Sequence, residues 1–251
     1  MGAAVAAASG RKDGMSRPRL FLPAAEWAGR VPLRGQARHK LVQVLRLEAG
    51  GEVEVFDGEG RACRAELERD GQGWFLRLGP ARQQGERRRR VRLGLALSKG
   101  RKPELVVRMA TEVGVSTLEP FLARRSVARP PAERWRQRRR RWQAIVREAA
   151  RQSGRSRLPE VGELRDFAGM LEQAGRSLAL ILQPGAEHTL PELLAREPGR
   201  ECLLLLGPEG GFQDDEIEQA RGAGFLEAGL PLPVLRAETA AVVAAALACM
   251  G

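Results

Sequence analysis

The apolar residues of this chain follow two different spacings. In the first third they alternate with polar residues, as in half-buried strands, over residues 51–56, 61–67 and 73–78. Later they form continuous runs, as in strands buried on both faces of a sheet, over residues 91–97, 115–121, 177–183 and 202–206. The change predicts a small β-rich domain followed by an α/β domain with a parallel sheet.

Segments with helical spacing separate the continuous apolar runs. Apolar residues recur every three or four positions over 103–113, and Gly114 is suited to end that helix. A longer helix is expected over 131–152, and an alanine-rich helix over 237–250 closes the chain. This alternation of strand and helix predicts β-α-β units with right-handed crossovers.

We expect the chain to divide into three segments. Residues 1–16 form a disordered or over-extended start, because their short apolar run has no basic region before it, as a leader would. Residues 17–86 form a small β-barrel with a helix over 37–47, which serves as a binding attachment or, alternatively, as a structural cap. Residues 87–251 form the α/β domain, after a charged connection rich in arginine.

The net charge of +11 is concentrated in one segment. Residues 124–157 hold thirteen arginines and only two glutamates, whereas basic and acidic residues balance over the rest of the chain. The cluster favours a polyanionic partner, with phosphate contacts expected from Arg124, Arg125, Arg129 and Arg155. The alternative is that these arginines only form a solvated helix face, in a chain that uses arginine far more often than lysine.

Several residue types exclude whole classes of site. Cys63, Cys202 and Cys249 lie far apart without metal-ligand spacing, so we expect reduced core thiols, a cytoplasmic protein and no metal. No apolar run approaches the roughly 20 residues of a membrane span, so no membrane partner is expected. The chain contains neither Asn nor Tyr, which excludes an Asn-Pro-Pro-Tyr amino-methyltransferase and any ribose methyltransferase that depends on an active-site Asn.

The apolar run that ends at Leu206 leads into a glycine-rich turn, Gly-Pro-Glu-Gly-Gly over residues 207–211. This turn is either a plain strand-to-helix connection or a ligand loop at the carboxyl end of a parallel strand. It lacks the glycine patterns of phosphate and dinucleotide sites, and Glu209 would repel a pyrophosphate. A ligand held here is therefore expected to be neutral or cationic where it touches the turn.

Three stretches occur in an order and spacing typical of one family. They are Leu-Ser-Lys-Gly-Arg-Lys-Pro-Glu-Leu from residue 97, Glu-Ala-Ala-Arg-Gln-Ser-Gly-Arg over 148–155, and Leu-Gly-Pro-Glu-Gly-Gly-Phe over 206–212 with Val-Leu-Arg-Ala-Glu-Thr-Ala over 234–240. Arg-Leu-Phe over 19–21 also matches. From residue 17 onward the chain resembles the ribosomal RNA small subunit methyltransferase E family, uridine-N3 methyltransferases of the SPOUT superfamily.

The resemblance implies an α/β fold: a SPOUT-type trefoil-knotted parallel-sheet domain preceded by a PUA-like β-barrel RNA-binding domain. It implies a homodimer that methylates N3 of a uridine in 16S rRNA of the small ribosomal subunit, with S-adenosyl-L-methionine as donor. Arg19 and Arg46, in the matching amino-terminal stretches, join the expected RNA contacts.

In this family three loops hold the donor. Carried over to matching positions, the expected donor-binding residues are Leu182, Gln183, Pro184, Leu206, Gly207, Gly210, Gly211, Leu230, Leu232, Val234, Leu235 and Thr239. The chain departs from the family in the third loop, where Pro231 replaces a glycine and Pro233 stands at a position that is commonly arginine. We expect any difference in donor geometry to arise there.

Methylation at N3 of uracil requires loss of the N3 proton. We expect Arg236 to stabilise negative charge on the uracil carbonyl oxygens, and Glu238 or Glu209 to accept or orient the proton. The alternative for Arg236 is an ion pair with Glu238 or a contact at the start of the helix that follows. Two other functions stay open: a SPOUT methyltransferase of another rRNA base, and an RNA-binding protein without catalysis.

Overall fold

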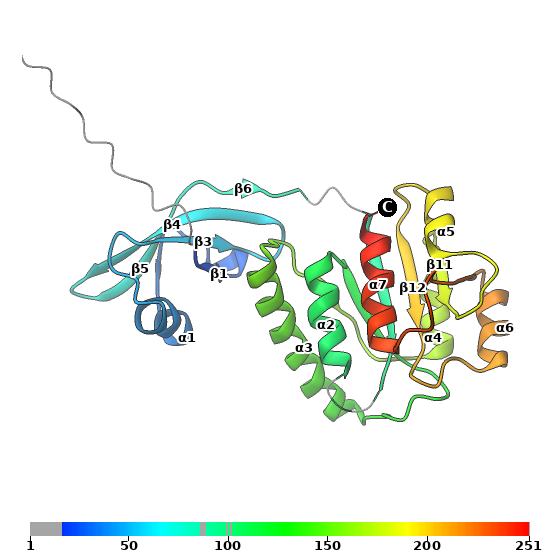
Figure 1. The fold of residues 1–251 in the computed structure, drawn as a ribbon. Helices are drawn as coiled ribbons and strands as arrows, with labels where there is room; N and C mark the ends of the chain where they lie inside the picture. Colours follow the sequence, from blue (N-terminus) through cyan, green and yellow to red (C-terminus); the bar gives the residue numbers. More distant parts are fainter. Residues whose placement is uncertain (1–16, 86–88, 99, 101, 251) are drawn as a thin grey trace, which may run out of the picture. The chain divides into compact units, whose positions relative to one another are not determined.

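The computed structural model of the chain describes residues 17–85, 89–98, 100 and 102–250. The chain divides into two compact units (Figure 1). Unit 1 runs to Phe56 and resumes over Ala62–Arg82, whereas unit 2 holds Asp57–Arg61 and the chain from Gln83 onward. The predicted start segment 1–16 and the predicted border between residues 86 and 87 lie outside the described residues.

Unit 1 is built on a sheet of short strands around a small apolar core. Val53, Val55 and Leu67 are fully buried there, as their alternation with polar residues predicts. The strands run in the order β1-β3-β4-β5-β2, with β6 paired to β4. They are β1 (Arg19–Phe21), β2 (Arg30–Pro32), β3 (Glu52–Phe56), β4 (Arg61–Asp70), β5 (Gly73–Leu78) and β6 (Arg82–Gln83).

The predicted helix over 37–47 is only partly an α-helix. α1 (Gly35–Arg38) continues as a π-helical turn, η2 (His39–Val44), and Arg46 then takes a φ of 53°, which is unusual outside glycine. Leu41 is buried, whereas Val44 is 60% exposed. The wider π turn changes which side chains face the core, and apolar spacing alone does not reveal that change.

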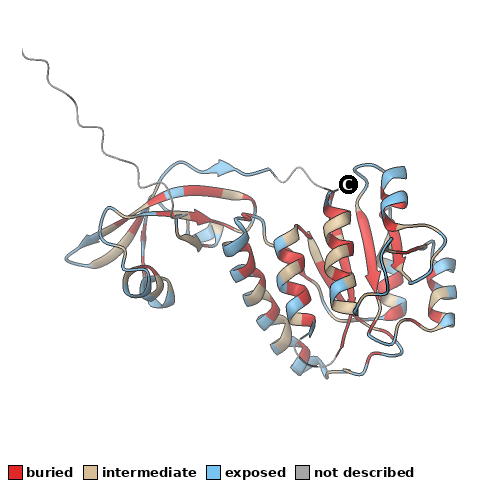
Figure 2. Ribbon diagram, viewed as in Figure 1, coloured by how far each residue is buried: buried red, intermediate tan, exposed pale blue. Residues whose placement is uncertain are grey.

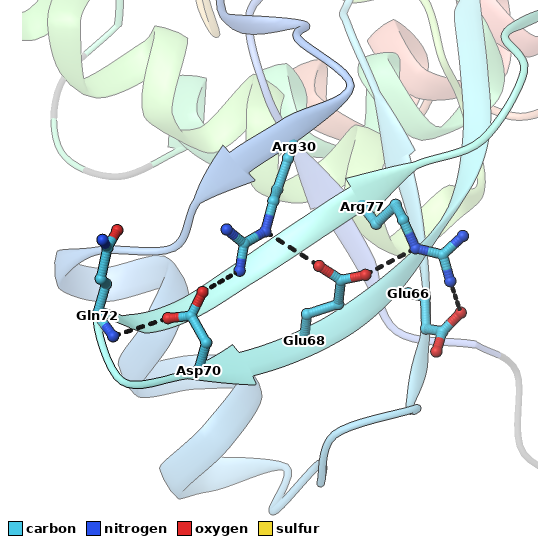
Figure 3. A network of polar contacts seen from close by, with 6 residues as sticks. All are labelled: Arg30, Glu66, Glu68, Asp70, Gln72 and Arg77. Carbon is cyan, nitrogen blue, oxygen red and sulfur yellow. Dashed lines mark hydrogen bonds and ion pairs between the residues drawn. The ribbon is translucent and has the colours of Figure 1, made fainter.

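Ion pairs run across the strands on one face of unit 1 (Figure 3). Arg30 pairs with Glu68 and Asp70, and Arg77 pairs with Glu66 and Glu68. A hydrogen bond from Arg30 holds the pKa of Asp70 below its usual value. These solvent-exposed pairs add little stability. Because three carboxylates meet two guanidinium groups, this network offers no surplus positive charge to a nucleic acid.

Unit 2 contains a parallel sheet of seven strands. The predicted runs over 91–97, 115–121, 177–183 and 202–206 are confirmed as its central strands, each with slightly different ends. The order is β10-β8-β7-β12-β11-β13, with β9 also paired to β8. The strands are β7 (Val91–Ala96), β8 (Thr117–Leu122), β9 (Glu160–Val161), β10 (Arg165–Asp166), β11 (Leu178–Leu182), β12 (Cys202–Leu206) and β13 (Leu226–Ala228).

Helices cover both faces of this sheet, which explains the continuous apolar runs. Leu204 and Leu206 belong to a core with α2, α3, α5 and α7, whereas Leu203 and Leu205 belong to a second core with α4 and α6. The central strands are accordingly buried along their length (Figure 2). The helices are α2 (Lys102–Val113), α3 (Ala132–Ser153), α4 (Phe167–Leu171), α5 (Leu190–Arg196), α6 (Asp214–Gly222) and α7 (Ala237–Met250).

Arg89, in the segment predicted to connect the domains, is a buried part of unit 2. Its Nη1 donates to the carbonyl oxygens of Glu197 and Arg200 at 2.7 Å each, and its Nη2 donates to that of Leu194 at 2.9 Å. These carbonyls lie at the carboxyl end of α5, where a positive charge is favourable. From a run of arginines in a sequence, a buried arginine that caps a helix end cannot be told apart from the arginines of a solvated linker.

The described part of the chain shows the state of the cysteines, of potential metal ligands and of long apolar helices. All three cysteines are buried and form no disulfide bond, and burial raises the pKa of Cys202 to about 12, as expected for a core thiol. No cluster of three or more potential metal ligands occurs among these residues. Within the same residues, no helix combines the length and the apolar character that crossing a membrane requires.

Candidate functional site

A cavity of about 480 Å³ lies at the carboxyl end of the sheet in unit 2. Three loops surround it, and they follow β11, β12 and β13 respectively. Because these three strands are parallel neighbours, their carboxyl ends meet at one edge of the sheet. The volume lies in the range of small-molecule sites.

Every donor-binding residue predicted from the family resemblance lines this cavity, except Thr239, which is exposed on the first turn of α7. Glu209 also contributes to the wall, whereas Arg236 and Glu238 do not. Further lining residues, outside the predicted donor-binding set, are Gly185, Pro208, Phe212, Pro233, Ala237 and Ala240. Pro233, a departure from the family pattern, is therefore part of the wall itself.

The loop after β12 passes closely over an aromatic ring. A Cβ added at Gly207 would lie 3.1 Å from the ring of Phe212, so the close backbone approach at this position favours glycine. Phe212 is 6% exposed and stacks against Phe121, with the ring centroids 6.2 Å apart. Gly211 has a φ of 71°, a conformation that also favours glycine. The glycine-rich turn is thus shaped by the aromatic cluster beneath it.

The loops after β11 and β13 are joined by backbone hydrogen bonds. Gln183 donates to the carbonyl oxygen of Ala228 at 2.9 Å, and Gly229 donates to that of His188 at 2.9 Å. Leu190 donates to the carbonyl oxygen of Gly229 at 2.7 Å, and it is the first residue after Thr189, which forms a capping box with Glu192. These hydrogen bonds fix the positions of two of the three loops that surround the cavity relative to each other.

Lys102 is a charged residue at this edge that sequence reasoning did not select. Its Nζ lies 3.3 Å from Oε1 of Glu209 and 3.7 Å from Oε2 of Glu238. Both carboxylates therefore have a cationic partner at the start of α2. The position of Lys102, after a buried strand that neighbours β12, is the signal that could have identified it.

Arg236 is exposed between cavity-lining Leu235 and Ala237. Its guanidinium forms no ion pair within the described residues, and Glu238 pairs with Lys102 instead. The alternative of an Arg236–Glu238 ion pair is therefore not realised in the structure.

The predicted RNA-binding arginines of the segment after β8 have different partners. Arg124 pairs with Asp215 at 2.5 Å and keeps 59% of its side chain exposed. Arg125 donates from Nη1 to the carbonyl oxygen of Gly210 at 2.5 Å. Arg129 donates to the carbonyl oxygen of Ala123 at 3.2 Å and remains exposed.

Two of the predicted RNA ligands have little free surface. Arg155 is 9% exposed and donates to the carbonyl oxygens of Thr111 and Val115, at the carboxyl end of α2. This corrects the prediction for Arg155, because its guanidinium stabilises a helix end and not a phosphate. The Arg19 side chain is 11% exposed and pairs with Glu54 at 2.6 Å. Arg46, by contrast, is exposed.

Much of the arginine cluster on α3 is neutralised or packed. Arg136, Arg139, Arg141 and Arg151 form ion pairs, and Arg138 lies over the ring of Trp142. These pairings reduce the positive charge that this part of the cluster offers to a polyanion. The exposed arginines of α3 without an ion pair among the described residues are Arg134, Arg140 and Arg147.

Sequence comparison assigns the chain to a family. The family profile described as an RNA methyltransferase domain matches residues 85–249, which is well over half of the chain. The ribosomal RNA small subunit methyltransferase E of Synechocystis sp. is 34% identical over 220 residues, spanning 86% of this chain and 71% of the relative. The chain belongs to the ribosomal RNA small subunit methyltransferase E family. A profile described as an RNA methyltransferase PUA domain matches residues 33–72.

Solved structures extend the family match to the fold. A ribosomal RNA small subunit methyltransferase E from Neisseria gonorrhoeae, bound to S-adenosyl methionine, is 26% identical. It aligns with a TM-score of 0.80 over 92% of this chain and 96% of its own. A methyltransferase of Legionella pneumophila with bound SAM aligns with a TM-score of 0.81 and 28% identity, over 93% of this chain and 97% of its own. This member of the family thus has the predicted PUA-like and SPOUT-type architecture.

Proposed function

We propose that this protein transfers the methyl group of S-adenosylmethionine to N3 of a uridine in small-subunit ribosomal RNA. It is an rRNA methyltransferase by family. The observation that carries the proposal is the cavity between the three loops, which contains no lysine or arginine among its lining residues. A donor without phosphate and with a cationic sulfonium needs no basic side chain there.

The cavity suits S-adenosylmethionine in size and chemistry. Leu182, Leu206, Leu230 and Leu235 offer apolar surface for an adenine ring. The glycines of the second loop expose backbone to a ligand without intervening side chains. Glu209 is the one charged residue among those that line the cavity. When bound, the donor supplies an electrophilic methyl group on its sulfonium sulfur.

The chain's own residues must present the uridine and manage its N3 proton. N3 lies on the Watson–Crick edge, so the base has to leave its pair or stack before it can reach the cavity. Exposed Arg236 stands beside cavity residues Leu235 and Ala237 and stabilises the charge that develops on the uracil oxygens. Glu209 accepts or orients the proton, because it lines the cavity whereas Glu238 does not.

The RNA reaches this edge through exposed arginines of unit 2. Arg124 and Arg129 flank the loop after β8, and Arg140 and Arg147 are seven residues apart on α3, so they share one face. Arg46 of unit 1 is a further contact. Phosphate contacts of this kind give affinity that falls as the salt concentration rises.

Donor binding provides the first test. Isothermal titration is expected to give saturable heat with S-adenosylmethionine and competition by its demethylated product. Ala240→Trp is the matched variant, because the indole would fill part of the cavity from α7 without altering the loops. We expect it to weaken donor binding by at least ~100-fold, about 2.8 kcal/mol. A wild-type protein without donor heat would indicate an RNA-binding protein without catalysis.

The base specificity requires a separate measurement. Small subunits from a strain that lacks this gene are incubated with the protein and the donor, and digested rRNA is analysed by mass spectrometry. We expect 3-methyluridine to be absent before incubation and present after it. A different methylated base would place the protein among SPOUT enzymes with another target.

We also propose a homodimer that uses α7. The sequence from Ala240 to Met250 contains no polar side chain other than Cys249, yet Val243, Ala246 and Met250 form a stripe that is partly or fully exposed. An apolar helix of this kind is normally covered on all sides. A second copy of the chain is the expected cover.

Val243→Glu tests this dimer. Light scattering after size exclusion is expected to give twice the chain mass of 27.5 kDa for the wild type and the single mass for the variant. The reason is that two carboxylates would face each other near a twofold axis. Leu226→Glu, at a partly exposed leucine of β13, is the control and should stay dimeric. A monomeric wild type at micromolar concentration contradicts the proposal.

The trefoil knot implied by the resemblance is a further proposal. α7 follows β13 at one edge of the sheet, yet it packs against α2 and β7 beyond β11 and β12. The chain therefore has to return across the loops that surround the cavity. A knot at this crossing would hold the three loops together. Knotted chains are rare among protein folds.

A further inference from the structure

The segment after β8 is fixed by a compact set of hydrogen bonds. The backbone amide of Arg124 donates to Oε1 of Glu216 at 2.9 Å, and Glu216 is 1% exposed. The amide of Ala123 donates to Oγ of Ser126 at 3.0 Å, and the amide of Ser126 donates back to the carbonyl of Ala123. The backbone on both sides of Arg125 is therefore held in place.

From this fixed segment, Arg125 reaches the glycine-rich turn of the cavity. Its Nη1 donates to the carbonyl oxygen of Gly210 at 2.5 Å and lies 3.5 Å from that of Phe212. Its Cδ lies 3.2 Å from the position that a Cβ of Gly210 would take. Since β7 separates β8 from β12 in the sheet, this contact joins two loops that no strand pairing connects.

The turn needs such a contact because its own residues provide few. Gly210 and Gly211 have no side chains, and glycine has more backbone freedom to lose than any other residue. Each residue that becomes ordered costs roughly 1–2 kcal/mol of conformational free energy. If the donor had to order the turn on binding, its apparent affinity would fall accordingly.

We propose that Arg125 is a positioning residue for the methyl donor. Its guanidinium holds the carbonyl group of Gly210 so that the turn has its binding shape before the donor arrives. This rests on the proposed function of the cavity. It also revises the expectation that Arg125 is an RNA ligand, because the guanidinium is directed to the protein backbone.

Arg125→Met removes the donor groups and keeps an unbranched side chain against Gly210. Loss of a charged hydrogen bond predicts an increase of about tenfold in the dissociation constant for S-adenosylmethionine, measured by isothermal titration. The Michaelis constant for the donor should rise similarly. At saturating donor, kcat and the Michaelis constant for small subunits should stay within about twofold. Arg125→Lys, which can still donate one bond, should restore part of the affinity.

Hydrogen exchange of the protein without donor reports on the turn itself. Peptides that cover residues 207–213 should exchange faster in Arg125→Met than in the wild type. Arg221→Met is the matched control, because Arg221 is a 64% exposed arginine that pairs with Glu227 away from the cavity. It should leave both exchange and donor affinity unchanged, and both variants should keep melting temperatures close to the wild type.

The outcomes separate this proposal from the function on which it rests. A wild type that binds the donor, with unchanged affinity and exchange in Arg125→Met, would overturn the role of Arg125 alone. If Arg125→Met raised only the Michaelis constant for small subunits, the proposed role in donor binding would be wrong, and Arg125 would instead be a phosphate contact. A wild type without donor binding would remove the proposed function, and the exchange measurement would still decide whether Arg125 orders the turn.

Discussion

Replacing Arg236 by alanine is expected to lower kcat for rRNA methylation by about 10²–10³-fold, the range for loss of one group that stabilises charge in a transition state. Affinity for S-adenosylmethionine should stay within about twofold, because Arg236 does not line the cavity between the three loops. The side chain is exposed next to that cavity and forms no ion pair among the described residues. It is therefore available to a base presented there.

The design of this experiment separates charge from fold. Arg236→Lys keeps a positive charge without the planar fork and should recover part of the rate. Arg221→Ala, on the surface of α6, serves as the control for loss of an exposed arginine. Single-turnover rates and donor titrations are measured on the same preparations. Full turnover with normal donor affinity in Arg236→Ala would contradict the catalytic role.

Phe212→Ala is expected to have the largest effect on stability. Phe212 is 6% exposed and contacts Phe121 and Phe167, with ring centroids 6.2 and 5.8 Å away. Truncating such a buried ring costs about 3–5 kcal/mol. For a chain of this size, the melting temperature should fall by roughly 10 °C. Gly207 also packs on this ring, so we expect donor affinity to fall as well.

Phe212→Leu tests whether volume or aromaticity dominates. Leucine refills most of the space, so most of the loss in melting temperature should be recovered. Phe75→Leu, in β5 of unit 1, is the control for a substitution outside this cluster. Differential scanning fluorimetry and donor titration are the measurements. A Phe212→Ala protein that melts within about 2 °C of the wild type would show that the ring does not support the turn.

The two carboxylates near the cavity show how pairing changes a sequence-based assignment. Glu209 and Glu238 were equal candidates for handling the N3 proton when only their motifs were considered. In the structure both lie within 4 Å of Lys102, and only Glu209 also lines the cavity. The lysine begins α2, more than 100 residues earlier, so no local pattern connects it with either glutamate.

The sequence by itself determined the central strands, the long helices and the three loops around the cavity. Continuous apolar runs such as Cys202–Leu206 report burial on both faces, because a strand exposes alternate residues to opposite sides. The glycine-rich turn and the residues before α7 also carried the family resemblance. These features are local, and local spacing is what a single sequence records.

Only the tertiary structure decided which arginines are available to RNA. Arg89 and Arg155 occur in arginine-rich segments, yet each is buried and binds carbonyl oxygens at a helix end. Arg125 donates to the backbone of the glycine-rich turn. Strands of two or three residues, such as β9 and β13, were likewise too short to give a periodic signal. The physical reason is shared: a side chain's role depends on its partner, and these partners lie far away along the chain.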